Sequence, residues 1–500
     1  MKVICHKHHE IQGISEILRL FYTDLVQQGP GELSVEDVGP LNLPGTFYSE
    51  LDREVTREEM RDQDDQSQVL VSSRLEGTDL KMEEKVVPSA IRRELKRQAY
   101  GILSQALDVH YPWGSLTGVR PGQVAYRSYL ELGCDFAKAK KDLVENWYLA
   151  PDKADLALET ALAEEDILQK CDSNLPMLYI GIPFCRTRCA YCSFITKDAT
   201  AKSARLDLYV AALISEIREL ADFFVSQGKS FQAIYVGGGT PTALPEDLFC
   251  QLMEVIDREI PRIDGAEITV EAGRPDSISK GKLEAIRSLG QVRLCINPQT
   301  MFDRTLELIG RDHTVADVYR SYHDARSLGF DSINMDLILG LPGESGEDFL
   351  CSLDKLLELG PESITLHTMA MKKSAFLEQK YREKFSKLRF PDQAMSVAFS
   401  RAVKELKNRG YKPYYLYRQK NVRGGLENIG FALPGHFSTY NVGMMSDRIS
   451  VLGLGSGSSS KLVQGTRLDR LCNPKDLKTY CERISDISQK KQDFFQTHSI

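Results

Sequence analysis

The chain of 500 residues is 42% hydrophobic and 27% charged, which is typical of a globular protein too large for a single core. With 63 Lys and Arg against 70 Asp and Glu, its net charge of -7 argues against a general binder of nucleic-acid backbones. The N-terminus, MKVICHKHHEIQG, has no signal-peptide pattern, and no stretch has the roughly 20 uninterrupted apolar residues that span a bilayer. We therefore expect a cytoplasmic protein that binds neither nucleic acid nor membrane. We also expect a monomer.

Residues 1–170 are predicted to form an α/β extension. The apolar run VLVSSRL predicts a strand beginning at Val69, and a helix is predicted from about Ser89 to Leu107. Glycine and proline mark the segment from Tyr111 to Tyr126 as a loop. Helical periodicity over residues 151–170 predicts a helix that connects to the next domain.

Residues 171–375 alternate short apolar runs with segments of helical length. Six runs are predicted strands: LYIGI at 178, AIYVGG at 233, EITVEAG at 267, VRLCINPQ at 292, SINMDLILGLPG at 332 and SITLHTMAM at 363. Helices between them require parallel strands, in either an open doubly wound sheet or a complete or partial barrel. In both cases the chemistry belongs at the C-terminal ends of the strands. Residues 376–500 are predicted to form a mostly helical domain that covers the substrate.

Three of the 11 cysteines are closely spaced directly after the first predicted strand, in GIPFCRTRCAYCSF. The spacing Cys185-x3-Cys189-x2-Cys192 lets three thiolates hold three irons of a 4Fe-4S cluster, and it leaves the fourth iron open to a chelating ligand. A structural zinc site needs four protein ligands, and no partner Cys-x2-Cys or His-x3-His lies close by in the sequence. The other cysteines are scattered and predict reduced thiols rather than a disulfide framework.

This motif, with Tyr191 before its last cysteine, resembles the signature of the radical S-adenosylmethionine (SAM) superfamily. The resemblance implies a partial (β/α)6 TIM-like barrel and an open iron that is chelated by SAM. The reduced cluster would then cleave SAM to methionine and a 5′-deoxyadenosyl radical. The turn GGGTPT after the second strand strengthens the resemblance, because glycines there let the backbone approach a bound ligand closely.

Polar residues occur at the ends of the later strands. Glu271 ends the third strand, Gln299 ends the fourth, and Asp336 lies in the fifth. Arg311, in the motif GRDHT, could pair with a carboxylate. Individually such residues are more often surface or capping residues, but their common position favours a binding site.

The order of motifs from about residue 178 to 345 is similar to that of oxygen-independent coproporphyrinogen III oxidases (dehydrogenases) and their haem-chaperone relatives. These motifs are LYIGIPFCRTRCAYCSF, YVGGGTPT, VEAGRPD, INPQTM, IGRDHT and DLILGLPGE. WGSLTGVRP and ENIGFALPGHFSTYNVGMM further resemble the Z-type subgroup. The resemblance implies that the three cysteines and Tyr179 carry the catalysis and that Tyr179, Gly238 and Glu271 contact the cluster-bound SAM. The residues that it implies for a second SAM are Tyr191, Gly239, Thr240, Gln299, Arg311 and Asp336.

Two positions depart from the oxidases that this chain resembles. Those oxidases carry a further cysteine where this chain has Phe194, as in the chaperone branch, and a histidine where it has Gly181. Neither change removes a cluster ligand. Both leave open the exact reaction and whether one SAM binds or two.

The leading hypothesis is the oxidative decarboxylation of coproporphyrinogen III to protoporphyrinogen IX in haem biosynthesis. The resemblance implies that the radical removes a hydrogen from the β-carbon of a propionate, with an electron donor such as flavodoxin or ferredoxin. The remaining propionates would pair with cations, and the candidates are Arg120, Arg418 and Arg423.

Two alternatives stay open. A haem chaperone would keep the cluster but deliver haem, and Cys5, His6, His8 and His9 could then ligate haem or metal, although such a pattern more often marks a solvent-facing strand end. An RNA- or protein-binding module on a tRNA-modifying radical enzyme is the other alternative. The net charge of -7 and the lack of a basic, aromatic-interleaved stripe argue against it.

Overall fold

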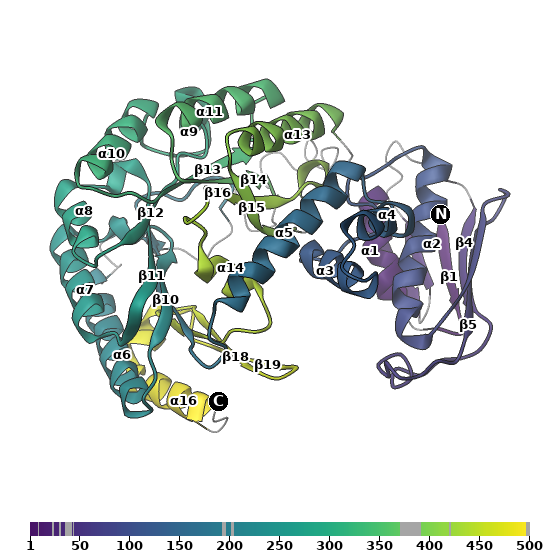
Figure 1. Cartoon of the computed structure of the whole chain (residues 1–500), viewed down its shortest axis with the longest axis horizontal. Helices are drawn as coiled ribbons and strands as arrows, with labels where there is room; N and C mark the ends of the chain where they lie inside the picture. The colour runs from purple at the N-terminus through teal and green to yellow at the C-terminus, as the bar shows by residue number, and fades with distance from the viewer. Residues whose placement is uncertain are drawn as a thin grey trace. The chain divides into compact units, whose positions relative to one another are not determined.

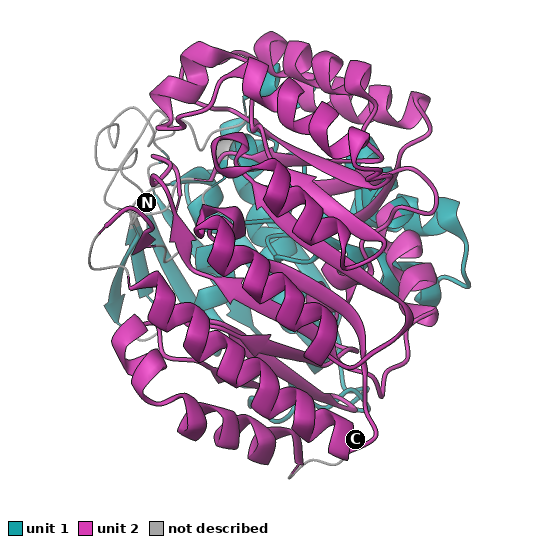
Figure 2. Ribbon diagram, turned by 90° about the vertical axis from the view of Figure 1, so that its left-hand side faces the viewer, with its two compact units in different colours: residues 1–159, 378–397, 416–427 teal, residues 160–377, 398–415, 428–500 magenta. Residues whose placement is uncertain are grey.

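A computed structural model of the protein describes residues 1–8, 10–22, 25–29, 32–35, 43, 45–192, 197–201, 205–370, 392–419 and 422–496. The chain divides into two compact units (Figure 2). The first comprises Met1–Glu159 with parts of 378–397 and 416–427, and the second comprises the described parts of Thr160–Leu377, Ala398–Tyr415 and Asn428–Ile500. The division into domains 1–170, 171–375 and 376–500 stays a prediction, and its second boundary lies outside the described residues.

The first unit contains one mixed sheet with the strand order β2-β3-β1-β4-β5-β6. These strands are β1 (Lys2–His6), β2 (Leu25–Gly29), β3 (Glu32–Val35), β4 (Thr46–Leu51), β5 (Val69–Leu75) and β6 (Lys81–Val86). Helices α1 (Ile11–Phe21) and α2 (Ile91–Leu107) share one buried apolar core with the sheet, which includes Ile17, Leu95, Phe47 and Val71. The predicted strand at Val69 and the predicted helix that ends at Leu107 are confirmed.

Three further helices follow, α3 (Pro121–Glu131), α4 (Phe136–Trp147) and α5 (Pro151–Gln169). The loop predicted to extend to Tyr126 ends at Arg120, because Pro121 begins α3, and proline is well tolerated in the first turn of a helix. Helix α5 confirms the helix predicted over residues 151–170, and it contributes residues to both units.

The second unit contains the six predicted strands, which lie next to one another in the order of the chain and run parallel. They are β7 (Met177–Ile182), β10 (Phe231–Gly238), β11 (Arg262–Gly273), β12 (Val292–Ile296), β13 (Ile333–Leu339) and β14 (Ser363–Thr368). Their apolar runs reflect burial on both faces, as is usual in parallel sheets. Figure 1 shows the helices that alternate with them as an outer arc: α6 (Leu206–Ser226), α7 (Glu246–Glu259), α8 (Lys280–Arg287), α9 (Asp303–Leu308), α10 (Val315–Ser327) and α11 (Gly346–Leu359).

The C-terminal part of the chain extends this sheet at both edges. Strands β15 (Lys412–Tyr417) and β16 (Asn428–Ala432) lie beyond β14, and β17 (Val451–Leu454), β18 (Ser459–Gln464) and β19 (Arg467–Cys472) lie beyond β7. Its helices are α13 (Gln393–Asn408), α14 (Thr439–Met445), α15 (Leu477–Glu482) and α16 (Ile484–Gln496). Because β15 and β19 are edge strands, the sheet is not closed, and the predicted partial (β/α)6 barrel is confirmed.

The five C-terminal strands were not predicted from the sequence. Segments such as VLGLGSGSSSK combine short apolar runs with glycine and serine, so neither period 2 nor period 3.6 is recognisable in them. Strands β16 and β17 form because β14 and β7 offer free edges to which they pair, and β15, β18 and β19 add to the sheet beyond them. Of the helices in the described part of the chain, none is both long and apolar enough to cross a bilayer.

Candidate active site

The cysteine motif directly follows β7 and is attached to the glycine turn after β10. The two-residue strand β8 (Phe184–Cys185) pairs with β9 (Lys197–Asp198). The backbone N–H of Gly239 donates to the Ile182 carbonyl at 2.8 Å, and that of Thr240 donates to the Phe184 carbonyl at 2.7 Å. The two strand ends are therefore held together by backbone hydrogen bonds.

The three cysteines of the motif form no disulfide, and all three are half-buried. Burial raises the pKa of the Cys185 thiol. The hydrogen bond from Thr240 and the positive charge of Arg274 act against this, and the neighbouring Cys189 and Cys192 thiols raise the pKa further. Within the described ranges no three His, Cys, Asp or Glu side chains converge tightly enough to hold a metal ion. The fit to an iron–sulfur cluster therefore rests on three adjacent sulfur donors and on the packing of the loop that carries them.

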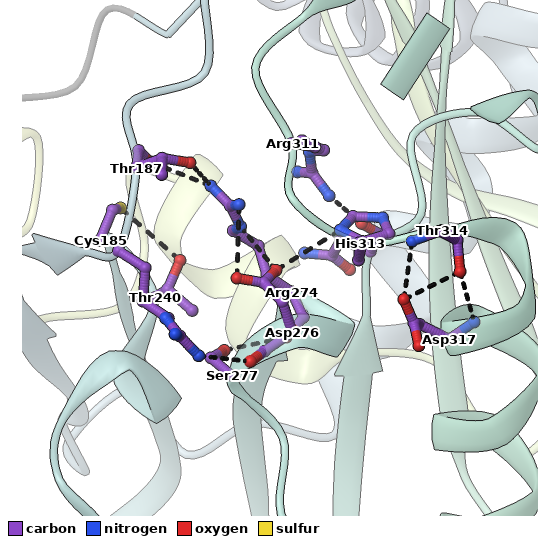
Figure 3. Close-up of polar contacts among 12 residues, drawn as sticks. Cys185, Thr187, Thr240, Arg274, Asp276, Ser277, Arg311, His313, Thr314 and Asp317 are labelled. Atoms are coloured by element: carbon purple, nitrogen blue, oxygen red, sulfur yellow. Dashed lines mark hydrogen bonds and ion pairs between the residues drawn. The ribbon is translucent and has the colours of Figure 1, made fainter. Parts of the chain in front are cut away.

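The glycine turn fits closely against the cysteine loop. A Cβ atom added to Gly239 would lie 2.4 Å from the Phe184 carbonyl oxygen and 3.0 Å from the Cys185 Sγ. Gly238 has φ 117°, a conformation that favours glycine. Thr240 Oγ1 lies 3.6 Å from the Cys185 Sγ (Figure 3). Any side chain at Gly239 would push the ligand loop out of place, so the turn requires glycine there.

Glu271 lies at the end of β11 beside a group of tyrosines. Its Oε1 accepts a hydrogen bond from the Tyr235 hydroxyl at 2.5 Å. The Tyr235 ring stacks on Tyr179 at 6.3 Å between centroids and on Tyr440 at 4.6 Å. Burial raises the pKa of the Glu271 carboxyl from 4.5 to about 7, and the nearby charge of Asp336 adds to this shift. The carboxyl therefore changes its protonation near neutral pH.

This raised pKa predicts a pH-dependent difference between the wild type and Glu271→Gln. Between the ordinary and the raised pKa the folded chain keeps a proton that the unfolded chain releases, so wild-type stability falls as pH rises through this range. The wild type should lose on the order of 2–3 kcal/mol relative to Glu271→Gln between pH 5 and pH 8. Melting temperatures of both apoproteins over this range measure the effect, and curves that stay parallel would contradict the raised pKa.

Asp336, on β13, is held by side chains from the same and the next strand. Its Oδ1 accepts from Asn334 Nδ2 at 2.7 Å, and its Oδ2 lies 3.6 Å from His367 Nε2. Burial opposes its charge, but the hydrogen bond and charge of His367 outweigh burial and leave its pKa below the usual value. The pKa of His367 is raised in turn, since the contact with Asp336 outweighs the burial of the imidazole. Asp336 is therefore an ionised acceptor inside the barrel.

The remaining predicted residues lie at the same end of the sheet. Gln299 adopts φ 71° and its backbone N–H donates to the Asp336 carbonyl at 2.9 Å. Its side chain is only 8% exposed, and its Oε1 has no hydrogen-bond partner. Arg311 Nη2 donates to the Tyr191 hydroxyl at 3.2 Å. A buried acceptor without a partner is costly, so Gln299 indicates a place for a ligand.

The structure thus brings the sequence-predicted residues to one end of the barrel, where they form two connected groups. The first contains Cys185, Cys189, Cys192, Tyr191, Gly239, Thr240 and Arg311. The second contains Tyr179, Gly238, Glu271, Gln299 and Asp336. Their roles as ligands of the cluster and of SAM stay predictions.

Sequence reasoning missed five residues of this region: Tyr235, Arg274, His313, His367 and Tyr440. Arg274 and His313 stand in VEAGRPD and IGRDHT, motifs that were interpreted only for Glu271 and Arg311. His367 stands in a predicted strand, SITLHTMAM. A polar residue within an otherwise apolar strand is a signal that could have identified it.

Other sequence candidates have different surroundings. The Arg418 guanidinium is buried and donates to the carbonyls of Leu116 and Gly425, so these donors are not available to a propionate. The side chain of Arg423, and all of Phe194, lie outside the described residues. Gly181, the other departure from the oxidases, accepts a hydrogen bond from the Tyr209 hydroxyl at 2.5 Å.

The N-terminal candidates are also placed, except His9, which is outside the described residues. His8 is buried, and its Nε2 lies 3.1 Å from the Ser49 hydroxyl. The expected solvent-facing strand end is therefore wrong for His8. Burial raises the pKa of the Cys5 thiol to about 12, and His6 stacks on Tyr48.

Comparison with known proteins identifies the family of this chain. The family model described as the radical SAM superfamily matches residues 179–356. A Bacillus subtilis protein named oxygen-independent coproporphyrinogen-III oxidase-like protein HemZ is 34% identical over 475 residues, which cover 90% of this chain and 93% of that protein. The B. subtilis heme chaperone HemW is 32% identical over 328 residues, which cover 64% of this chain and 78% of the chaperone.

Among solved structures, coproporphyrinogen III oxidase (HemN) from Escherichia coli has a TM-score of 0.50 and 24% sequence identity. The match covers 65% of this chain and 72% of HemN, and at this identity it shows a shared fold. The two B. subtilis relatives have names that refer to haem or to a precursor of haem. The chain belongs to the radical SAM superfamily, within its haem-related branch, and to the family of the oxygen-independent coproporphyrinogen-III oxidase-like protein HemZ.

Proposed function

We propose that the protein is a radical SAM coproporphyrinogen dehydrogenase, which converts coproporphyrinogen III to protoporphyrinogen IX without oxygen. The observation that carries this proposal is the match to HemZ, named as coproporphyrinogen-III oxidase-like, over 93% of that relative. A match of this length includes both the barrel and most of the chain outside it. The match to HemW leaves about a third of this chain unaligned, since it covers 64%.

Membership of the superfamily implies a 4Fe-4S cluster and SAM, for which Cys185, Cys189 and Cys192 would supply three sulfur ligands. When bound, these groups supply a carbon radical that removes a hydrogen atom from the β-carbon of a propionate. The resulting substrate radical would then lose CO2 and pass one electron to an electron acceptor, which leaves a vinyl group, and two such events would give the product. A small electron-transfer protein of the flavodoxin or ferredoxin type would be the reductant.

The residues of the barrel would bind SAM and keep water out. Tyr179, Gly238 and Glu271 would contact the SAM at the cluster. If a second SAM binds, its proposed contacts are Tyr191, Gly239, Thr240, Gln299, Arg311 and Asp336. The ionised Asp336 suits an ammonium or a hydroxyl group, and the Arg311 guanidinium suits a carboxylate. Their burial strengthens each of these interactions relative to water.

A haem chaperone is the second candidate, because the heme chaperone HemW is 32% identical over more than half of this chain. A chaperone would bind haem and leave coproporphyrinogen III unchanged. The two functions therefore predict different results with the same protein sample.

The decisive experiment is an anaerobic assay of the reconstituted protein with coproporphyrinogen III, SAM and a reductant. We expect protoporphyrin, detected by fluorescence and chromatography after oxidation, together with 5′-deoxyadenosine. Cleavage of SAM with unchanged porphyrinogen would overturn the dehydrogenase. In that case a haem titration that gives a saturable Soret band would support the chaperone.

A further inference from the structure

A buried arginine forms hydrogen bonds to the loop that carries the cysteines. Arg274 directly follows β11 and is only 3% exposed. Its Nη1 donates to the Thr187 carbonyl at 3.0 Å and to the Thr187 hydroxyl at 2.6 Å (Figure 3). Thr187 is the middle residue between Cys185 and Cys189. Arg274 therefore holds the segment that joins two of the three sulfur donors.

Asp276 orients this arginine. Arg274 Nε lies 3.0 Å from Asp276 Oδ1, and its Nη2 lies 3.4 Å from Asp276 Oδ2. The backbone carbonyl of Asp276 accepts a further bond from Arg186 Nη1, in the cysteine loop, at 2.7 Å. A forked contact of this kind fixes a guanidinium in one orientation.

The segment after α9 also contacts Asp276 and the cysteine loop. The fully buried His313 places its Nδ1 3.5 Å from Asp276 Oδ1. The Thr187 hydroxyl donates to the Gly310 carbonyl at 3.0 Å, and the Ala190 N–H donates to the Ile309 carbonyl at 2.9 Å. The cysteine loop is thus held between the segment after β11 and the segment after α9.

The buried charges of Arg274 and Asp276 stabilise each other. Burial disfavours the Asp276 carboxylate, but hydrogen bonds and charges from His313 and Arg274 keep its pKa well below the usual value. Removing one partner of such a buried pair leaves the other without compensation.

We propose that Arg274, oriented by Asp276 and His313, is a positioning residue that holds the Cys185–Cys189 segment in the shape needed to bind the iron–sulfur cluster. This inference rests on the proposed cluster at the three cysteines, and it is independent of the porphyrinogen. Partners of metal ligands typically change metal affinity 10- to 100-fold when they are removed. Arg274 acts through Thr187, because its side-chain hydrogen bonds within the described residues go to Thr187 and Asp276 and not to a cysteine sulfur.

The test compares Arg274→Gln and Arg274→Lys with Arg262→Gln. Arg262 lies at the opposite end of the same strand and pairs with an aspartate, Asp257, at 2.6 Å, so it is a matched control. Circular dichroism and melting temperature establish that each variant is folded. The readouts are iron and sulfide per chain after anaerobic reconstitution, the rate of iron release to a chelator, and the midpoint potential of the cluster.

We expect Arg274→Gln to release iron on the order of 10-fold faster than the wild type. Its midpoint potential should be lower, since the Asp276 carboxylate then lacks its cationic partner near the cluster. Arg274→Lys restores the positive charge but not the two-point contact of the guanidinium with Asp276. Its midpoint potential should therefore return closer to the wild-type value than its rate of iron release does. Arg262→Gln should behave as the wild type.

If Arg274→Gln does not fold, Thr187→Val tests the same contact from the side of the cysteine loop, where Thr187 is half-buried. Thr187→Val removes the hydroxyl that accepts a hydrogen bond from Arg274 and donates one to the Gly310 carbonyl. We expect it to speed iron release by a smaller factor than Arg274→Gln does. Wild-type release rates and potentials in folded Arg274→Gln or in Thr187→Val would overturn the inference alone. A wild type that takes up no cluster would instead overturn the proposed function.

Discussion

Replacing Cys185 with alanine is expected to abolish SAM cleavage, to the background seen without iron. Two remaining thiolates cannot hold three irons of a cubane, so the cluster should not assemble in a form with one open iron. The variant should remain folded, because the thiol is half-buried and its hydrogen bond from Thr240, at 3.6 Å, is weak. Chromatography of 5′-deoxyadenosine and the visible absorbance of the reconstituted protein measure the two effects.

Cys250→Ala is the matched control for this experiment. Cys250 is also free and half-buried, but it lies on α7 and its thiol is 3.9 Å from the Gly281 carbonyl. It should keep the cluster and cleave SAM at the wild-type rate. Normal cleavage by Cys185→Ala would show that the cluster is held elsewhere, whatever the substrate of the enzyme.

Replacing Lys491 with methionine is expected to destabilise the second unit by about 3–5 kcal/mol. Lys491 is 1% exposed, and its Nζ lies 2.5 Å from an oxygen of Glu216, which is fully buried. Without the lysine, the Glu216 carboxylate is a buried charge without its cation. Within the described residues it would keep three neutral donors, which are the Gly455 N–H at 2.8 Å, Asn473 Nδ2 at 3.0 Å and the Tyr480 hydroxyl at 2.7 Å.

Because the chain has two compact units, its unfolding need not be two-state. Hydrogen exchange of α6 and α16, which carry Glu216 and Lys491, therefore measures the effect where it arises, and thermal unfolding complements it. Lys478→Met is the matched control, since Lys478 forms an exposed pair with Glu482 at 3.9 Å and should change stability by less than about 0.5 kcal/mol. Unchanged exchange in Lys491→Met would contradict the role of this pair. The double variant with Glu216→Leu should recover part of the loss, because no charge then remains buried.

Local sequence patterns are sufficient for much of this protein. The spacing of Cys185, Cys189 and Cys192 predicts three candidate sulfur donors and the length of the loop that carries them. Six apolar runs that alternate with helical segments predict a parallel sheet, in which the C-terminal ends of the strands lie at one edge. Both patterns depend on residues that are neighbours in the sequence. They can therefore be recognised without knowledge of the tertiary structure.

The C-terminal strands could not be read in the same way. Residues 451–454 become a strand because they pair with β7, more than 250 residues earlier in the chain. Segments that are short and rich in glycine have little preference of their own, and an available sheet edge decides their conformation.

The partners of the site residues were also decided only by tertiary structure. The sequence indicates Glu271, Asp336 and Cys185 as candidates by type and position, but it does not show that Tyr235 bonds to Glu271 or that His367 faces Asp336. These contacts join residues on different strands, and their geometry follows from strand register.

The sequence by itself determined the superfamily and the six barrel strands, and it indicates the three cysteines as candidate sulfur donors, because each of these patterns depends on residues that are close together in the chain. Tertiary structure alone decided which buried charges are paired. Lys491 meets Glu216 across 275 positions, and Arg274 meets Thr187 across 87. An ionisable side chain is equally compatible with a solvated surface and with a buried partner until folding brings that partner within a few ångströms.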